Sequence, residues 1–482
     1  MFNFYKKHLI FKRETVLRSL KRPEVLFVLF ASFFGLTLVF LVPPMQAPDE
    51  QTHFFQSYAV SNLDFKPHRF QNEKYTYYGS ELPKSVFVAT DDFLTDTAGK
   101  PDVEFDTRLF GEYINQPLNP QVTAHEHNGS GYAPIVYLPQ AIGITIGKIF
   151  NTSPLIMIWL GRLINLIVWV VLIYLAIKII PFGKWAMAIL ALNPMAVFLS
   201  ASLSADVVTT ALAFLFFSII ASSLVSKSTL STKTTITLVG LLVLLGLTKP
   251  TNILFGLLLL AIPWKSFVTL RKFWLICLGS IGIAIAVSLA WNVVVVGEAS
   301  QSTAQLQRPG VGIDSAAQLT GIVQQPLYFI KTLLVNYVFV TPGHYGNQVL
   351  QSTFGRFGWL DTSLPLWTIA LYILGLFLAL IYQLGRGKRL SLFQKAVSLT
   401  ILFGLCLANV LAMYLVYTPA GNSVIDGVQG RYFIAGSVLL LGLFTARSKY
   451  LEFSEKRMAI ILSSIMFIVL TMTIVSIYMR YY

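Results

Sequence analysis

The sequence contains little charge and almost no cysteine. Only 12% of its 482 residues are Asp, Glu, Lys or Arg, whereas 55% are hydrophobic. Soluble domains carry about 25% charged residues, so a soluble enzyme, a disordered protein and a nucleic-acid-binding protein are excluded. Cys277 and Cys406 lie far apart in apolar stretches, which predicts neither a disulfide framework nor a metal site. The composition indicates a polytopic membrane protein.

The charges are distributed unevenly along the chain. Lys and Arg number 36 against 22 Asp and Glu, and 36 − 22 gives +14. The cations occupy short segments between apolar runs, which is typical of cytoplasmic membrane loops rather than of a basic domain. Residues 1–22 hold seven cations and one acid, which places them in the cytoplasm. Residues 44–132 hold 13 of the 22 acids but only six cations, so we expect them outside.

Apolar runs of about 17–25 residues are long enough to cross a membrane. With a shorter run at 252–264 that crosses as a tilted or broken helix, they predict an all-α protein of about eleven spans. The N-terminus is then inside and the C-terminus outside. The ten longer runs begin near Glu24, Leu155, Lys184, Ala205, Thr234, Phe273, Pro365, Lys395, Arg431 and Arg457.

The predicted organisation is one integral membrane domain, residues 1–482, with an embedded external subdomain at 44–132. Residues 298–364 and 418–430 form the second and third external segments. Residues 133–150 are interpreted as a juxtamembrane helix, because Lys148, Gly143 and Gly147 weaken that run as a span. An additional crossing there would also invert the side of every later loop.

Two carboxylates and an imidazole follow the first span, where the sequence reads VPPMQAPDEQTH. If a helix begins at Asp49, then Glu50 and His53 follow at helical spacing. The functional interpretation is a general base or a metal ligand. The alternative is an N-cap with a solvated first turn, because Asp is favoured at that position.

Further charged residues are expected near the same membrane surface. Asp206 follows a serine-rich turn, and Arg162 is predicted to be its partner because ions within the membrane rarely remain unpaired. A helix cap is the alternative for Asp206. Four more residues, each of which could instead lie at lipid headgroups, extend the set: Lys249, Arg356, Gln429 and Arg431. Cations and acids together suit a lipid-linked phosphate and an incoming hydroxyl group.

Metal sites are only weakly indicated. His125, Glu126 and His127 are of metal-binding types, but no third ligand is suggested at a suitable spacing. The acids between residues 91 and 106 are interpreted as a solvated face, with Ca²⁺ binding as a minor alternative.

Four sequence elements carry a resemblance to a known family. They are APDEQTH after the first span, SASLSAD before the span at Asp206, TKP at Lys249 and GVQGRYF near the end. Together they resemble a bacterial family of predicted membrane proteins of unknown function, which is similar to the GT-C class of glycosyltransferases. The resemblance covers nearly the whole chain.

The resemblance implies a sugar transferase in the bacterial cytoplasmic membrane with its active site facing outside. Its donor would be a polyprenyl-phosphate-linked sugar, and its acceptor a cell-surface glycan or glycolipid. Asp49 would be the general base of an inverting transfer, with Glu50 sharing that role or orienting the acceptor. Lys249 and Arg431 would hold the lipid phosphate, and Asp206 and Arg162 would support the site. Many GT-C enzymes use a divalent ion, Mg or Mn, although no ligand set in this sequence requires one.

Three other functions remain open. A lipid-linked glycan flippase or other transporter would show inverted repeats and charges at the membrane midplane. A polysaccharide polymerase or ligase would depend on paired external arginines more than on Asp49. A structural assembly subunit would tolerate Asp49→Asn without effect.

Overall fold

The computed structural model describes residues 22–71, 76–119, 121–126, 131–226, 228–297, 312–338, 345–386, 390–446 and 454–482. The predicted cytoplasmic segment up to residue 21, His127 and residues 298–311 lie outside these ranges. Within them, seven helices are long and apolar enough to cross a membrane. They are α2 (Pro23–Leu41), α7 (Pro154–Ile179), α10 (Asp206–Val225), α12 (Leu270–Ala290) with its continuation η5 (Trp291–Val296), α17 (Leu366–Arg386), α18 (Leu392–Val416) and α21 (Glu455–Tyr481). The expectation of a mostly helical membrane protein is confirmed.

Shorter elements occupy the four other predicted spans, which is where the structure differs from the count of eleven. The run from Lys184 is broken at Asn193 because Pro194 lacks an N–H and the Asn193 side chain accepts a hydrogen bond from Met195 N, 2.9 Å away. The elements are α8 (Lys184–Ala191), α9 (Pro194–Ser200), α11 (Thr232–Thr248), η3 (Pro250–Ala261), η4 (Trp264–Phe267), η7 (Gly430–Phe433), α19 (Ile434–Ser437) and α20 (Leu440–Leu443).

Local sequence determines where several of the long helices begin. Pro154 starts α7, and the Ser153 hydroxyl caps it by accepting from Ile156 N at 3.3 Å. Ser391 and Gln394 form a reciprocal capping box at the start of α18. Pro43 and Pro44 follow α2 and cannot continue a helix.

The external segment predicted at 44–132 has structure of its own. It contains α3 (Glu50–Ser61), α4 (Lys84–Thr95), α5 (Arg108–Ile114) and three strands, β1 (His68–Gln71), β2 (Thr76–Pro83) and β3 (Val122–Glu126). The strands form an antiparallel sheet in the order β1-β2-β3, with Arg69 opposite Tyr78 and Glu81 opposite Ala124. This sheet is an addition to the predicted all-α fold.

Residues 133–150 form η2 (Pro134–Val136) and α6 (Leu138–Ile149), which packs against α7 and α3. Gly143 allows this packing, because a Cβ there would overlap the backbone of Leu160. The remaining elements are α14 (Ser315–Gln324), α15 (Pro326–Leu333), η6 (Leu334–Val338), α16 (Tyr345–Phe354), β4 (Arg356–Phe357) and β5 (Thr362–Ser363).

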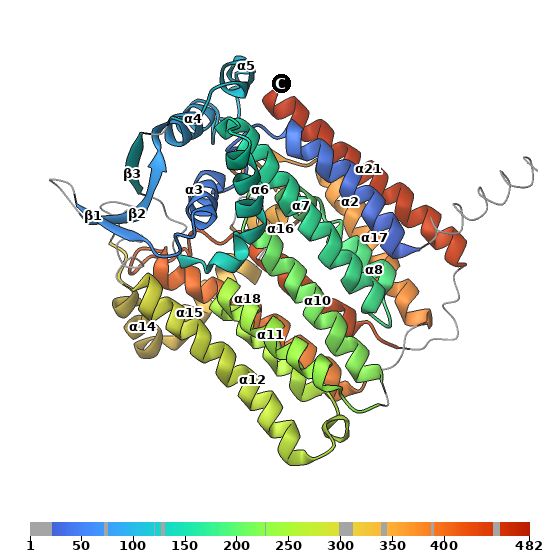
Figure 1. Cartoon of the computed structure of the whole chain (residues 1–482). Coiled ribbons are helices and arrows are strands. Elements are labelled where there is room, and N and C mark those ends of the chain that lie inside the picture. Colours follow the sequence, from blue (N-terminus) through green and yellow to red (C-terminus); the bar gives the residue numbers. More distant parts are fainter. Residues whose placement is uncertain are drawn as a thin grey trace, which may run out of the picture.

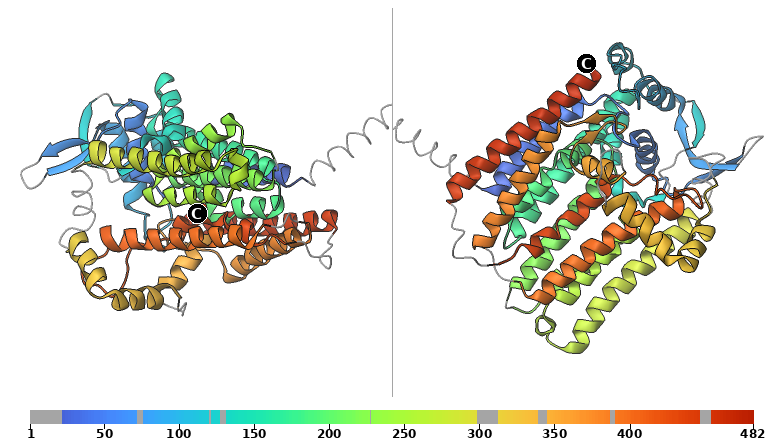
Figure 2. Two further views of the ribbon diagram at one scale, coloured as in Figure 1. Left: turned by 90° about the horizontal axis from the view of Figure 1, so that it is seen from below. Right: turned by 180° about the vertical axis from the view of Figure 1, so that it is seen from behind.

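The long helices lie side by side, with α2 against α7 and α21, and α10 between α7 and α11 (Figure 1). The β1–β3 sheet, α3, α4 and α5 gather at one end of this bundle. The two further views place α14 and α15 at the same end (Figure 2). We call this the sheet-bearing end, and the candidate site lies there.

Candidate functional site

The Glu50 carboxylate is completely buried against Arg162. Glu50 Oε2 lies 2.6 Å from Arg162 Nη2, and Glu50 Oε1 lies 2.8 Å from Arg162 Nε. The side chains of both residues have 0% exposure. Glu50 also accepts hydrogen bonds from Leu203 N at 3.1 Å and from Ala47 N at 3.4 Å. Both oxygens are therefore already occupied by protein donors.

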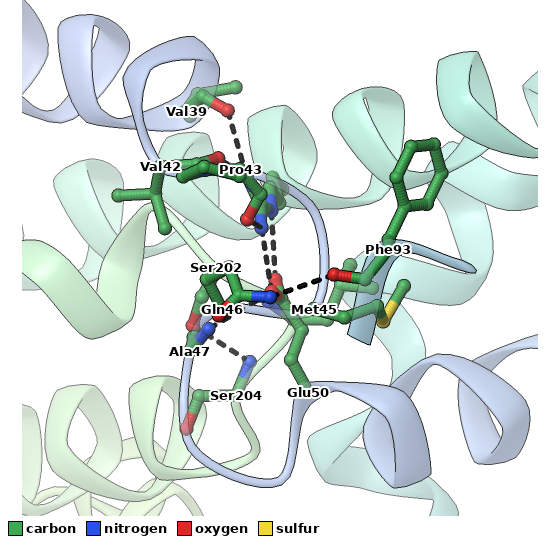
Figure 3. Close-up of polar contacts among 12 residues, drawn as sticks. Val39, Val42, Pro43, Met45, Gln46, Ala47, Glu50, Phe93, Ser202 and Ser204 are labelled. Atoms are coloured by element: carbon green, nitrogen blue, oxygen red, sulfur yellow. Dashed lines mark hydrogen bonds and ion pairs between the residues drawn. The ribbon is translucent and has the colours of Figure 1, made fainter. Parts of the chain in front are cut away.

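Arg162 joins this carboxylate to the end of α2. Its guanidinium donates to the carbonyl oxygens of Val39, Val42 and Pro43 at 3.1, 2.6 and 3.0 Å. Figure 3 shows Val39, Val42 and Pro43 on one side of these contacts and Glu50 on the other. Val39 lies in the last turn of α2 and Val42 is its C-cap residue, so the helix offers their carbonyl groups no N–H, and Arg162 satisfies both. The pair thus connects α2, α3, α7 and the turn before α10.

The predicted pairing of Arg162 with Asp206 is wrong. Arg162 is fully used by Glu50 and the α2 carbonyls, whereas Asp206 Oδ1 pairs with Lys249 Nζ at 2.6 Å. The sequence indicated Asp206 alone as the partner of Arg162. The acid that pairs with Arg162 is Glu50, which lies beside the C-terminal carbonyl groups of α2.

Asp49 occupies a different environment from its neighbour Glu50. It takes the N-cap position of α3, but its φ of 60° is left-handed and its side chain makes no capping hydrogen bond. The carboxylate is instead directed to Arg431, whose Nη2 donates to Asp49 Oδ2. The Asp49 side chain is 49% exposed, so an incoming molecule can reach it. The simple N-cap interpretation therefore does not explain where this side chain points.

Arg431 links Asp49 to Asp206. Its Nη1 lies 3.6 Å from Asp206 Oδ2, and its side chain is only 4% exposed. Tyr432 lies beside both cations, with Lys249 Nζ 4.7 Å and the Arg431 guanidinium 5.4 Å from its ring centroid. Asp49, Asp206, Lys249 and Arg431, which we call the charge cluster, carry two negative and two positive charges.

Gly430 explains how Arg431 reaches this position. The start of η7 lies directly on α16, where Gly430 N donates to Ser352 Oγ at 2.8 Å. A Cβ at Gly430 would overlap Thr353 N and Val349 O. Only glycine permits this backbone contact, and this explains why the QGRYF element has a glycine before its arginine.

His53 and three tyrosines surround the charge cluster. His53 Nδ1 lies 3.1 Å from the Tyr137 hydroxyl, and the ring also packs near Tyr132. Burial lowers the pKa of His53 to about 4, and the charge of Arg431 adds to this effect. His53 is therefore neutral near pH 7. Burial alone would raise the pKa of Asp49, but the positive charge of Arg431 and its hydrogen bond lower it overall, and His53 adds to this only at acid pH, where its ring is protonated.

The structure brings together only part of the predicted set. Asp49, His53, Asp206, Lys249 and Arg431 lie in or beside the charge cluster. Arg162 and Glu50 form the separate buried pair, and Arg356 and Gln429 line a cavity between α16 and residues 417–429. Within the described ranges, no group of three or more His, Cys, Asp or Glu residues could hold a metal ion.

Sequence reasoning did not identify Tyr132, Tyr137 and Tyr432. Tyr432 is part of the QGRYF element, so its position beside Arg431 could have been noticed. Tyr132 and Tyr137 come from the segment around η2, and nothing in their spacing indicates that they meet His53.

These features define a polytopic helical membrane protein with a buried ion pair and a partly exposed charge cluster at one end. The chain belongs to the family described as "Predicted membrane protein (DUF2142)", which matches residues 30–440. None of the curated proteins and none of the solved structures matches the chain.

Proposed function

We propose that the protein is a membrane glycosyltransferase of the GT-C type. It transfers a monosaccharide from a polyprenyl-phosphate carrier to a cell-surface glycan or glycolipid at the outer face of a bacterial cytoplasmic membrane. The observation that carries the proposal is the half-exposed Asp49 paired with the buried Arg431, in a cluster that also holds the partly buried Lys249 on Asp206. A carboxylate beside two cations suits a reaction that takes a proton from a hydroxyl group and releases a phosphate.

Each member of the charge cluster has a distinct role in this proposal. Arg431 and Lys249 bind the donor phosphate and stabilise the charge that develops as it leaves. Asp49 accepts the proton of the acceptor hydroxyl while that oxygen forms a bond to the anomeric carbon. The bond from this carbon to the phosphate oxygen breaks, and polyprenyl phosphate leaves with the bonding electrons. Attack opposite the leaving group inverts the anomeric centre.

The charge balance of the cluster supports Asp49 as the base. Two carboxylates and two cations leave the cluster neutral before the donor binds, because His53 is uncharged near pH 7. A donor phosphate adds negative charge and competes with Asp49 for Arg431. Both effects raise the proton affinity of Asp49, since its low pKa depends on Arg431. Donor binding therefore converts a weak base into a stronger one.

Glu50 has a positioning role rather than a catalytic one in this mechanism. Its two oxygens receive four protein hydrogen bonds and its side chain has no exposure. An acceptor hydroxyl could reach it only after the Arg162 pair had separated, which would leave a buried charge without a partner. Asp49 requires no such rearrangement.

The test compares cells that lack the protein with cells that carry wild type, Asp49→Asn or Asp106→Asn. Asp106 is a matched control because it lies in the same external segment, is 42% exposed and pairs with Arg108 at 2.8 Å. Mass spectrometry would measure both surface-glycan sugars and polyprenyl-phosphate sugars. We expect one glycan sugar to disappear and its lipid-linked form to accumulate in the deletion and in Asp49→Asn, but not in Asp106→Asn.

Two other results would redirect the assignment. If Asp49→Asn behaves as wild type while the deletion alters glycan length, the protein is a polymerase or ligase and Asp49 is not its base. If the deletion leaves complete lipid-linked glycan on the cytoplasmic side, the protein is a flippase or other transporter rather than a transferase.

A further inference from the structure

A polar cavity is lined in part by the chain segment that leads into Arg431 of the charge cluster. It has a volume of about 310 Å³ and is lined by side chains from α16, β4 and residues 417–429. Small-molecule sites have volumes of about 300–1,000 Å³. Gln429, one of its lining residues, is two positions before Arg431 in the chain. The loop that carries Arg356 also contacts the segment before Asp49, because Trp359 Nε1 donates to Met45 O at 3.0 Å.

Two side chains in this cavity have unused hydrogen-bonding capacity. Gln429 Oε1 is buried and has no hydrogen-bond partner among the described residues. Arg356 Nε donates to Leu360 O at 2.6 Å, and within the described ranges its two terminal nitrogens make no hydrogen bond. An unpaired buried acceptor costs about 1–3 kcal/mol. A ligand that supplies a donor to Gln429 would remove this cost, and an acceptor on the same ligand would pair with the terminal nitrogens of Arg356.

The composition of the lining selects the class of ligand. The lining residues include one arginine and one carboxylate, that of Asp426, so their formal charges leave no net positive charge to favour a phosphate. A sugar hydroxyl is both donor and acceptor, which matches the Gln429 and Arg356 groups together. The Tyr417 ring closes one wall, and Gly427 is required beside it because a Cβ there would overlap that ring.

We infer that this cavity binds a sugar unit of the acceptor, with Gln429 and Arg356 as its hydrogen-bonding residues. The inference rests on the proposed transferase function and adds the position of the acceptor to it. Each of the two substrates then has its own site. The donor phosphate binds at Arg431 in the charge cluster, and the acceptor sugar binds in the cavity at Gln429. The acceptor hydroxyl would enter from this side toward Asp49.

The experiment measures binding, not turnover, on the purified full-length protein. Saturation-transfer NMR would follow methyl glycosides of glucose, mannose, galactose and N-acetylglucosamine at concentrations up to tens of millimolar. A separate titration would follow undecaprenyl phosphate. The variants are Gln429→Leu and Arg356→Met, which keep most of the side-chain volume, and the control is Arg108→Met, whose side chain is 85% exposed.

We expect wild type and Arg108→Met to bind at least one glycoside, and both cavity variants to bind it about five- to tenfold more weakly. All four proteins should bind undecaprenyl phosphate equally, and equal thermal unfolding temperatures show separately that the variants are folded. Absence of glycoside binding to wild type, or unchanged binding to both variants, would overturn the inference. Loss of undecaprenyl phosphate binding in the folded cavity variants would also overturn it, because the cavity would then belong to the donor.

The same data separate this inference from the proposed function. If wild type binds a glycoside through Gln429 but does not bind undecaprenyl phosphate, the sugar site stands and the donor assignment fails. If it binds undecaprenyl phosphate and no glycoside, the donor assignment stands and the sugar site fails.

Discussion

The adjacent residues Asp49 and Glu50 should respond in opposite ways to loss of their charge. Glu50→Gln leaves Arg162 buried with a positive charge and no counterion, because both side chains have 0% exposure. Removing one partner of a buried ion pair costs about 3–5 kcal/mol. Asp49→Asn removes a half-exposed charge, and Arg431 still has Asp206 at 3.6 Å. We therefore expect a much smaller loss of stability in Asp49→Asn.

The assay combines thermal unfolding of the purified variants with transfer activity. Glu50→Gln should unfold at a markedly lower temperature than wild type, and its purified yield should fall. Asp49→Asn should unfold close to wild type but lose about 10²- to 10⁴-fold in kcat, the usual contribution of a general base. A stable, inactive Glu50→Gln together with an active Asp49→Asn would refute the reasoning, because Glu50 would then be the base.

Four further predictions follow from single contacts. His53 has a pKa of about 4 against an ordinary 6.5, so its contribution to stability is complete above pH 6.5 and is lost as pH falls toward 4; unfolding temperatures that fall equally in wild type and His53→Gln over this range would contradict it. Arg480 donates to Val103 O at 2.6 Å and pairs with Asp361 at 2.9 Å. Arg480→Met should therefore speed proteolysis near residue 103, and an unchanged cleavage rate would show that Arg480 does not hold this segment in place. Gly430→Ala should abolish activity and lower the unfolding temperature because its Cβ overlaps α16; a stable, active variant would contradict it. If donor binding raises the pKa of Asp49, the acid limb of kcat should lie at higher pH than that of kcat/KM, and coincident limbs would count against it.

The apolar runs predicted the long helices well, because about 20 consecutive apolar residues have few alternatives to a spanning helix. The pattern failed at Asn193 and at the run from Arg431, where capping side chains and close contacts break the helix locally. Such breaks depend on single hydrogen bonds and on neighbouring backbone, neither of which alters the hydropathy of the run.

The candidate site could be predicted only as a set of residue types at one membrane surface. Sequence placed Asp49, Asp206 and Arg431 on the same side, and the structure brings them into one cluster. Which acid pairs with which cation depends on packing, so the partner of Arg162 was assigned wrongly. The lesson is general for polytopic proteins, in which charged residues distant in sequence meet at helix ends.

The buried pair of Glu50 and Arg162 is costly to form, but it positions the charge cluster. Burying Glu50 and Arg162 removes two charges from water, which by itself does not favour folding. Their hydrogen bonds, however, fix the end of α2, the start of α3 and the turn at Leu203 to one another. Asp49 is the residue before Glu50, and Asp206 is three residues after Leu203. The pair therefore holds the two carboxylates of the charge cluster at a defined separation. Apolar side chains in place of Glu50 and Arg162 could give the same stability, but they would not form the hydrogen bonds that provide this positioning.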